Sequence, residues 1–229
     1  MMLNCLKWHN VPCCHSTDGL SSYSRTIGSM DDESGLRARR RAQTRQDIAA
    51  AAAALFARHG VAQVTTAQIA DAAGVSLRTF YRYFDTKEQA VAPVLEIGAA
   101  RWQELLASAD GEARAAIAAA IDEVLTVDGA DAVEQMLGIR PLLRALPDDT
   151  ELRAVWHRVN HDSEELICGI IAEHEGWASD RFHARLLAVA ATEAIRIGLE
   201  EWAASEAGTT GAGSPAQLAR LAFDVLAPR

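Results

Sequence analysis

Apolar residues recur every three to four positions along most of this chain, and this spacing limits what it can fold into. Ile48, Ala52, Leu55 and Phe56 are one example, with intervals of four, seven and eight residues from the first. Residues at these intervals lie on one face of an α-helix, whereas a half-buried strand requires alternation at every second residue. No segment shows a convincing two-residue alternation, and no repeat of solenoid length is present. The sequence therefore predicts an all-α protein with about nine helices.

Turn signals separate three short segments near the N-terminal third of the chain. The first segment ends at Gly60, a residue type that favours helix C-termini. Thr65 or Thr66 caps a second, short helix, and Gly74 after it supplies the positive φ of a tight turn. A third helix is predicted over residues 77–83. A helix, a glycine-containing turn and a second helix form the helix-turn-helix pattern, whose second helix enters the DNA major groove.

The predicted helix over residues 77–83 carries aromatic and basic side chains on different faces. Phe80 and, just beyond the helix, Phe84 can close a small core with the preceding helices. On the opposite face, arginines would reach phosphates or guanine edges, and tyrosine hydroxyls would donate to phosphate oxygens. An ordinary surface helix with solvated arginines is the alternative. The opposite face consists of Leu77, Arg78, Tyr81 and Arg82, and Tyr83 lies between the two faces.

The block TTAQIADAAGVSLRTFYRYFDTKEQAV closely resembles the N-terminal DNA-binding domain of the TetR family of bacterial transcriptional regulators. The resemblance covers roughly residues 44–95. It implies an N-terminal three-helix helix-turn-helix DNA-binding domain, followed by a C-terminal helical domain for ligand binding and dimerisation. The matching residues are Thr66, Ile69, Ala70, Ala73, Gly74, Val75, Ser76, Thr79, Tyr81, Tyr83, Phe84, Lys87 and Glu88.

The resemblance also implies which side chains contact DNA. Thr79, Tyr81 and Lys87 would bind phosphates, while Leu77, Arg78 and Arg82 are the candidates for base readout. The basic run from Arg37 to Arg45 would track the DNA backbone or reach a minor groove, or it is a solvated arm. The complete set of expected DNA-binding residues is Thr66, Leu77, Arg78, Thr79, Tyr81, Arg82, Tyr83 and Lys87.

Charge is distributed unevenly along the chain. The formal net charge is −9, but residues 36–88 hold nine basic and four acidic residues, a net +5, while residues 89–229 carry a net −12. One segment is thus suited to a polyanion and the other is not. We expect a disordered leader at 1–35, a helix-turn-helix domain at 36–88, and an effector-binding and dimerisation domain at 89–229.

The first fifteen residues contain Cys5, Cys13 and Cys14 together with two histidines. Their spacing lacks the paired pattern of a zinc site, so we expect no metal there. Met30 offers an alternative start for the chain. No run approaches the roughly 18 apolar residues of a membrane span, and no apolar signal segment is present. We therefore expect a cytoplasmic protein, nucleoid-associated when bound to its operator, with no membrane partner.

By the same resemblance, two helices over residues 179–205 and 215–226 would form the interface of a homodimer, with packing only inside the monomer as the alternative. Their apolar residues are Leu186, Leu187, Val189, Ala190, Ile197, Trp202, Leu218, Leu221, Phe223 and Val225.

An effector pocket is expected in the C-terminal domain. Residues 136–173 look similar to the C-terminal domain of an acyl-CoA-responsive TetR subgroup that includes the mycofactocin-system regulator, in which an apolar cleft holds a fatty chain. Arg140, Arg144 and Arg153 would meet an anionic head group such as that of acyl-CoA, or are simply solvated. The expected pocket residues are Leu137, Ile139, Leu142, Leu143, Leu146, Trp156, Ile167 and Ile171.

Catalysis finds little support in the sequence. His157 and His161 share a helix face, but the residues between them are Arg, Val and Asn, so the glutamate of a zinc hydrolase motif is missing. No nucleophile elbow, P-loop or dinucleotide fingerprint is present. A non-specific architectural DNA binder is a second alternative, but it would require an overall basic surface. We therefore expect neither an enzyme nor a cofactor.

Pro93 is expected to interrupt a helix that begins near Asp85 and runs through Leu106. A proline two turns into a helix removes one hydrogen bond and kinks the axis, which would create a hinge between the two domains. A helix that simply starts later is the alternative.

Together these observations predict a DNA-binding transcriptional regulator of the repressor type. It would bind double-stranded, palindromic operator DNA as a homodimer and be released by a small apolar or acyl-type effector, with acyl-CoA as one candidate.

Overall fold

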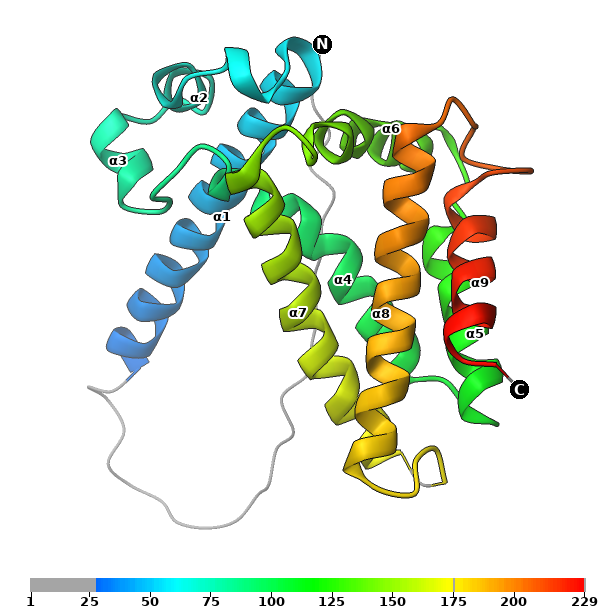
Figure 1. Cartoon of the computed structure of the whole chain (residues 1–229). Coiled ribbons are helices and arrows are strands. Elements are labelled where there is room, and N and C mark those ends of the chain that lie inside the picture. Colours follow the sequence, from blue (N-terminus) through cyan, green and yellow to red (C-terminus); the bar gives the residue numbers. More distant parts are fainter. Residues whose placement is uncertain (1–27, 175, 229) are drawn as a thin grey trace, which may run out of the picture. The chain divides into compact units, whose positions relative to one another are not determined.

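The computed structural model describes residues 28–174 and 176–228, and every regular element within them is a helix (Figure 1). The all-α prediction is confirmed for these residues. In chain order the elements are α1 (Gly28–His59), the 3-10 helix η1 (Val61–Gln63), α2 (Thr66–Ala72), α3 (Leu77–Tyr81), the 3-10 helix η2 (Gln89–Val91), α4 (Ala92–Ala107), α5 (Ala113–Leu125), α6 (Ala130–Ala145), α7 (Thr150–Glu173), α8 (Arg181–Ala204) and α9 (Pro215–Leu226).

The chain divides after Arg39 into two units, and the structure from Arg40 onward is described below. Residues 1–27 of the expected disordered leader, with their cysteines and histidines, lie outside the described residues. Residues 28–35 belong to α1, whereas a leader is expected as far as residue 35, and the predicted domain bounds stay a prediction. An isolated glycine such as Gly35 costs a helix only about 1 kcal/mol relative to alanine. That cost is too small to end a helix propagated by residues 36–59, which contain no glycine or proline.

Helices α1, α2 and α3 close around a small aromatic and aliphatic core. Ile48 of α1, Ile69 of α2 and Phe80 of α3 are completely buried. The ring of Phe84 packs against that of Phe80, with 5.8 Å between the centroids. Because α2 and α3 are only seven and five residues long, they depend on this shared core rather than on their own hydrogen bonds.

The remaining helices form a second, larger packed group. Helix α4 packs on α5 and α7, α8 packs on both α7 and α9, and α9 also covers α5 (Figure 1). The largest fully buried side chains of this group include Leu106, Ile117, Leu152, Trp202 and Phe223. Among the described helices, none is long and apolar enough to cross a membrane.

Helices α8 and α9 approach each other closely at one glycine. A Cβ atom built on Gly198 would lie 2.5 Å from the backbone nitrogen of Ala219, closer than real carbon–nitrogen contacts allow. Packing therefore requires glycine at position 198, because any side chain there would clash with the backbone of Ala219.

Pro93 does not kink a helix. Helix α4 begins at Ala92, so Pro93 lies in its first turn. Backbone N–H groups in the first turn have no acceptor within the helix, so the N–H that proline lacks costs no hydrogen bond there. The prediction of a continuous helix from Asp85 with a hinge at Pro93 is wrong. The segment between α3 and α4 contains only turns and the 3-10 helix η2, and Pro93 marks the place where a regular helix begins.

Candidate DNA interface and effector region

A reciprocal pair of hydrogen bonds fixes the start of α2. The backbone N–H of Gln68 donates to the Thr65 hydroxyl at 3.3 Å, and the backbone N–H of Thr65 donates to the Gln68 side-chain oxygen at 2.8 Å. This capping box satisfies two donors that a helix start leaves free. Thr66, expected to contact DNA, is the first residue of α2 and is half-buried.

The turn between α2 and α3 follows the sequence signals closely. Gly74 has a φ of 66°, a value that L-residues with side chains rarely adopt. Ser76 then caps α3, since its hydroxyl accepts a hydrogen bond from the Thr79 backbone N–H at 3.1 Å. The Ser76 and Thr79 hydroxyls are also hydrogen-bonded at 2.9 Å, which holds the Thr79 side chain at the N-terminal end of α3.

The face of α3 opposite the core is open to solvent. Leu77 and Tyr81 are 44% and 52% exposed, and Arg78 and Arg82 are also exposed. Arg78, Thr79, Tyr81 and Arg82 together line one hollow in the surface. A single short helix thus presents two guanidinium groups and two hydroxyls, the donors that bind phosphates and base edges. The DNA contacts themselves remain a prediction.

Tyr83 is half-buried just beyond α3, and two arginines lie near its ring. The guanidinium carbon of Arg82 lies 5.4 Å from the ring centroid, and that of Arg41 on α1 lies 5.9 Å away. Both distances are within the range of cation–π attraction. The sequence indicated no link between Arg41 and this helix, because 42 positions separate Arg41 from Tyr83.

Lys87 is engaged inside the protein. Its ammonium group donates to the carbonyl oxygens of Val61 at 2.7 Å and Val64 at 2.9 Å. The Glu88 carboxylate lies 3.7 Å from the same nitrogen. Lys87 thus binds the segment that joins α1 to α2, and in this conformation it lies away from the hollow on α3. Its predicted phosphate contact would require the ammonium to leave one of these partners.

A bidentate ion pair connects α1 to α4. Both terminal nitrogens of Arg45 donate to the two oxygens of Glu96 at 3.1 Å, and the guanidinium also lies 5.9 Å from the Phe84 ring centroid. Parallel hydrogen bonds of this kind fix relative orientation as well as distance. Arg45 was expected in a DNA-tracking run, and no local sequence signal identifies Glu96 as its partner.

The predicted effector residues are mostly buried. The exceptions are Leu137, which is 42% exposed, and Ile139, which is half-buried. The buried residues of the set are Leu142, Leu143, Leu146, Trp156, Ile167 and Ile171. All eight lie on α6 and α7 or at the end of α6, and their role in effector binding remains a prediction.

The three arginines considered for an anionic head group bind the protein's own carbonyl oxygens. Arg144 donates to Ala203 at 2.5 Å and to Ser205 at 2.7 Å, both at the C-terminal end of α8. Arg140 donates to the carbonyl of Ala207. Arg153 donates to the carbonyls of the turn between α6 and α7. Because free helix C-terminal carbonyls carry partial negative charge, Arg144 acts as a cap of α8.

A charged cluster lies on α8 facing α7. Arg196 binds Glu193 and Glu200 on its own helix, and both carboxylates hold its pKa above the usual arginine range, Glu193 having the larger effect. Glu200 also accepts a hydrogen bond from the indole N–H of Trp156 at 2.7 Å. The Trp156 side chain is therefore held in place by α8 rather than free to rearrange.

Comparison with known proteins places the N-terminal segment in a defined family. Residues 48–92 match the model for bacterial regulatory proteins of the TetR family. The chain is 28% identical to the mycofactocin biosynthesis transcriptional regulator MftR of Mycobacterium tuberculosis over 170 residues, 73% of this chain and 84% of MftR. It is 30% identical to the HTH-type transcriptional regulator TcmR of Streptomyces glaucescens over 179 residues, 73% of this chain and 76% of TcmR.

Solved structures share the fold. The repressor FadR of Thermus thermophilus, in complex with lauroyl-CoA, has a TM-score of 0.54 and 23% identity, over 80% of this chain and 92% of FadR. The repressor AlkX of Dietzia sp., implicated in the biodegradation of n-alkanes, has a TM-score of 0.54 and 25% identity, over 80% of this chain and 93% of AlkX.

The relatives are regulators of transcription, and so is this protein, which is not an enzyme. The family match falls on the helix-turn-helix described above, and the similarity to TcmR extends well beyond it. The chain belongs to the TetR family of bacterial transcriptional regulators.

Proposed function

We propose that this regulator is a repressor that binds a palindromic operator as a homodimer and leaves it when a small apolar or acyl-type effector binds. The observation that carries the proposal is the exposed face of α3, where Arg78, Thr79, Tyr81 and Arg82 surround one hollow over a fully buried Phe80. The rigid core fixes the helix, and the exposed donors match phosphates and base edges. Thr66, Leu77, Tyr83 and Lys87 complete the proposed DNA-contacting set.

Two substitutions separate base reading from phosphate binding. Arg78→Ala should relax the preference at one base pair per half-site by about 1–3 kcal/mol. Tyr81→Phe should weaken binding to all sequences equally, because it removes one phosphate hydrogen bond. The operator is first selected from randomised DNA with the purified protein, and affinities are then measured on its single-base variants. Arg158→Ala, which removes an exposed arginine from α7, is the matched control. If Arg78→Ala lost the same affinity on every single-base operator variant, base reading by Arg78 would be contradicted.

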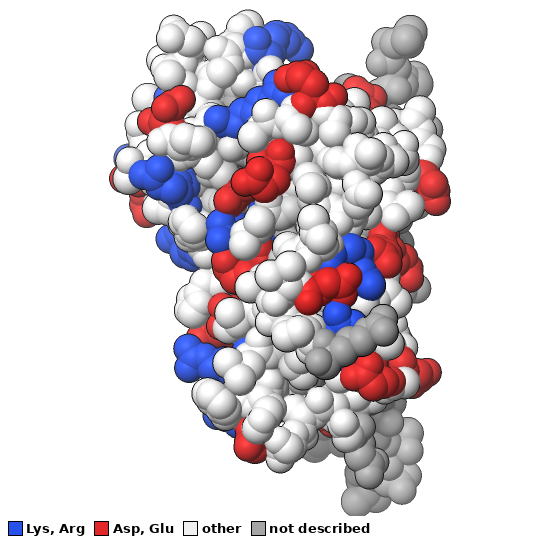
Figure 2. Space-filling view, turned by 45° about the vertical axis from the view of Figure 1, so that its right-hand side comes forward, with Lys and Arg blue, Asp and Glu red and all other residues white. Residues whose placement is uncertain are grey.

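Exposed apolar side chains on α8 and α9 support the homodimer. Leu186, Ile197, Leu221 and Val225 are exposed by 50%, 36%, 63% and 72%. In Figure 2, which brings the right-hand side of Figure 1 forward, uncharged surface separates scattered groups of acidic and basic side chains. Apolar surface of this kind on two adjacent helices favours burial against a second copy. A dimer also lets two reading helices span half-sites about 34–36 Å apart.

Charge substitutions test this interface. Leu186→Glu and Leu221→Glu should each produce monomers that bind the operator poorly, measured by sedimentation and DNA titration. Leu166→Glu is the control, since Leu166 is 56% exposed but lies on α7. Dimers that persist in both α8 and α9 variants would rule out this interface.

The effector class rests on the buried apolar side chains of α6 and α7 and on similarity to FadR, which was solved with lauroyl-CoA. An effector acts only through its different affinities for the DNA-bound and free conformations. Lauroyl-CoA should therefore lower operator affinity, whereas free coenzyme A should not. No change in affinity with either compound would remove the acyl-CoA candidate and leave DNA binding unaffected.

A further inference from the structure

Two deeply buried polar groups of the C-terminal domain have no hydrogen-bond partner among the described residues. They are the indole N–H of Trp102 on α4 and the hydroxyl of Thr192 on α8. Trp102 is 3% exposed and Thr192 is 4% exposed. Buried polar groups are almost always paired, because an unpaired one keeps the cost of leaving water without recovering a bond.

Helix register relates both groups to Ser163 on α7. Ser163 on α7 is 4% exposed and accepts a hydrogen bond from the Gln103 side chain at 3.3 Å, which brings this part of α4 level with Ser163. Trp102 precedes Gln103 directly in α4.

The pairing of α7 with α8 brings Thr192 to this level as well. The hydrogen bond from Trp156 to Glu200 fixes how the two helices of this hairpin are aligned. Ser163 follows Trp156 by seven residues and Thr192 precedes Glu200 by eight, distances of about 10 and about 12 Å at 1.5 Å per residue. Ser163 and Thr192 thus lie within about one residue's rise of each other, and Trp102 is next in sequence to Gln103, which binds Ser163.

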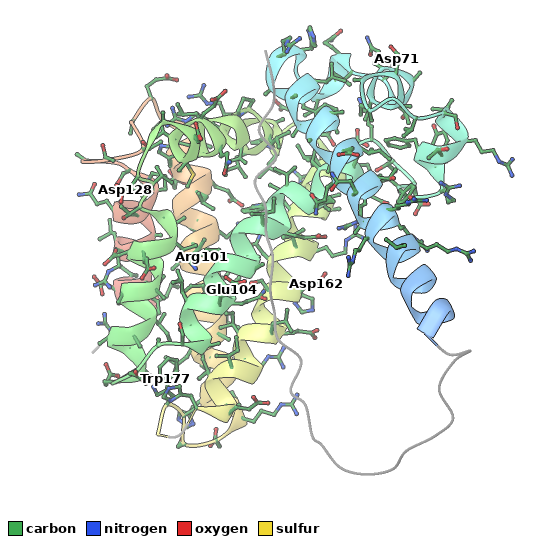
Figure 3. The ribbon with its side chains drawn as sticks, turned by 180° about the vertical axis from the view of Figure 1, so that it is seen from behind. Asp71, Arg101, Glu104, Asp128, Asp162 and Trp177 are labelled. Atoms are coloured by element: carbon green, nitrogen blue, oxygen red, sulfur yellow. The ribbon has the colours of Figure 1, made fainter. Side chains whose placement is uncertain are left out.

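The charged neighbours of this level are either exposed to solvent or already paired with each other. Figure 3 labels Arg101 and Glu104 on α4 and Asp162 on α7. The side chains of Arg101 and Glu104 are 52% and 66% exposed, and Asp162 is also exposed. Arg196, one turn after Thr192, is paired with two glutamates. Because Arg196 is already bound by two carboxylates, a buried anion at this level would find no unpaired cation among these neighbours.

We propose that Trp102 and Thr192 are the polar anchors of the effector site, and that the part of the effector they bind is neutral and carries a hydrogen-bond acceptor such as a carbonyl oxygen. Trp102 can only donate, so the ligand atom that it meets must accept. The thioester carbonyl of an acyl chain has this chemistry, and so does a ketone, whereas a free carboxylate would be buried without a cation. This inference rests on the proposed function only in that it assumes a small-molecule effector.

The free protein itself provides the first test. Thr192→Val removes an unpaired hydroxyl at nearly constant volume, so it should raise the Tm by about 2–4 °C. Ser163→Ala, at the same level, removes a paired hydroxyl and leaves Gln103 without its partner, so it should lower the Tm. Trp102→Phe and Trp177→Phe form a second matched pair. Trp102→Phe removes an unpaired N–H, whereas Trp177→Phe removes an N–H that donates to the Gly111 carbonyl at 3.0 Å. A lower Tm for Thr192→Val would overturn the proposal, because it would mean that the hydroxyl is already paired.

Ligand chemistry provides the second test. 2-Decanone, decanoate and decylammonium have similar chain lengths and differ in charge. The ketone should raise the Tm of the wild-type protein and bind at least tenfold more weakly to Trp102→Phe and to Thr192→Val than to the wild type, with Trp177→Phe unaffected. Failure of the ketone to bind, or tighter binding of decanoate or decylammonium, would overturn the neutral-acceptor assignment. Neither test uses DNA, so operator binding that fails while these tests succeed would count against the proposed function alone.

Discussion

Helix starts in the DNA-reading region and in the effector region are capped by different chemistry. Hydroxyls of Thr65 and Ser76 cap α2 and α3. In the effector region the carboxylates of Glu112, Asp149 and Asp180 cap α5, α7 and α8, and α9 alone of its side-chain-capped helices has a hydroxyl cap, from Ser214. A carboxylate interacts more favourably with the positive end of a helix, but near DNA it would also repel phosphates. The comparison indicates that α2 and α3 combine full capping with helix starts that carry no negative charge.

The two regions also differ in what holds them together. Helices α2 and α3 are short and rely on one aromatic core, whereas α7 and α8 have 24 residues each and pack along most of their lengths. The reading region should therefore lose its structure after a single core change, and the effector region should resist most of them.

The largest expected effect comes from Phe80→Ala. Phe80 is completely buried and touches the rings of both Tyr81 and Phe84. Its truncation should cost about 3–5 kcal/mol through lost contacts and a cavity. Amide hydrogen exchange should rise throughout α2 and α3, and DNA binding should be lost while the C-terminal helices keep their protection. Equal loss of protection in both regions would show that they fold as one unit.

A glycine substitution gives the next largest effect and tests the effector region. Gly198→Ala forces a Cβ against the backbone of Ala219, and such overpacking costs about 1–3 kcal/mol. The Tm should fall and the dimer should weaken. Gly169→Ala on α7 is the control, because a Cβ there meets nothing within 4 Å. That substitution should raise stability by about 0.5–1 kcal/mol, as alanine favours helix. A rise in Tm for both variants would contradict the close α8–α9 crossing.

Features that depend on neighbouring residues could be predicted from the sequence. The turn at Gly74 and the cap at Ser76 were found because each depends on residues within three or four positions. The position of Pro93 was misjudged because the preceding segment had the composition of a helix but forms turns and one 3-10 helix.

Interactions between residues far apart in the sequence were also not predicted. Arg45 with Glu96, and Arg144 with the end of α8, are separated by 51 and about 60 positions. Arginines have the same local appearance whether they meet DNA, a ligand or a distant carbonyl. The unpaired groups of Trp102 and Thr192 were missed for the same reason, since burial and pairing are properties of the packed helices.

A third prediction concerns the capping chemistry directly. Ser76→Asp should preserve the Tm, because aspartate caps helices as well as serine does. DNA affinity should fall roughly tenfold at low salt, and the difference should shrink as salt screens the added charge. Asp180→Ser, the reverse change on α8, should leave DNA affinity unchanged. If Ser76→Asp bound DNA as tightly as the wild type, neutral caps would have no role in DNA recognition.

The smallest effect is a difference in pH dependence between the two kinds of cap. The Asp180 carboxylate accepts hydrogen bonds from the backbone N–H and the ring of His183, both at 2.9 Å. The backbone bond is the larger cause that lowers the pKa of Asp180 below its ordinary value of 3.8. Because the folded-state pKa is depressed, the stability from this cap is complete above pH 3.8 and is lost as the pH falls through the lower folded value.

Asp180→Asn isolates this contribution, since asparagine caps a helix without titrating. The Tm of wild type and variant should be similar near neutral pH, and the wild type should lose more of its Tm than the variant as the pH is lowered below 4. Ser76→Asn is the matched control on α3, where the native cap is a hydroxyl and the difference in Tm should stay constant with pH. A constant difference for Asp180→Asn as well would show that the charge of the α8 cap contributes nothing, and the two regions would then differ only in how their caps affect DNA.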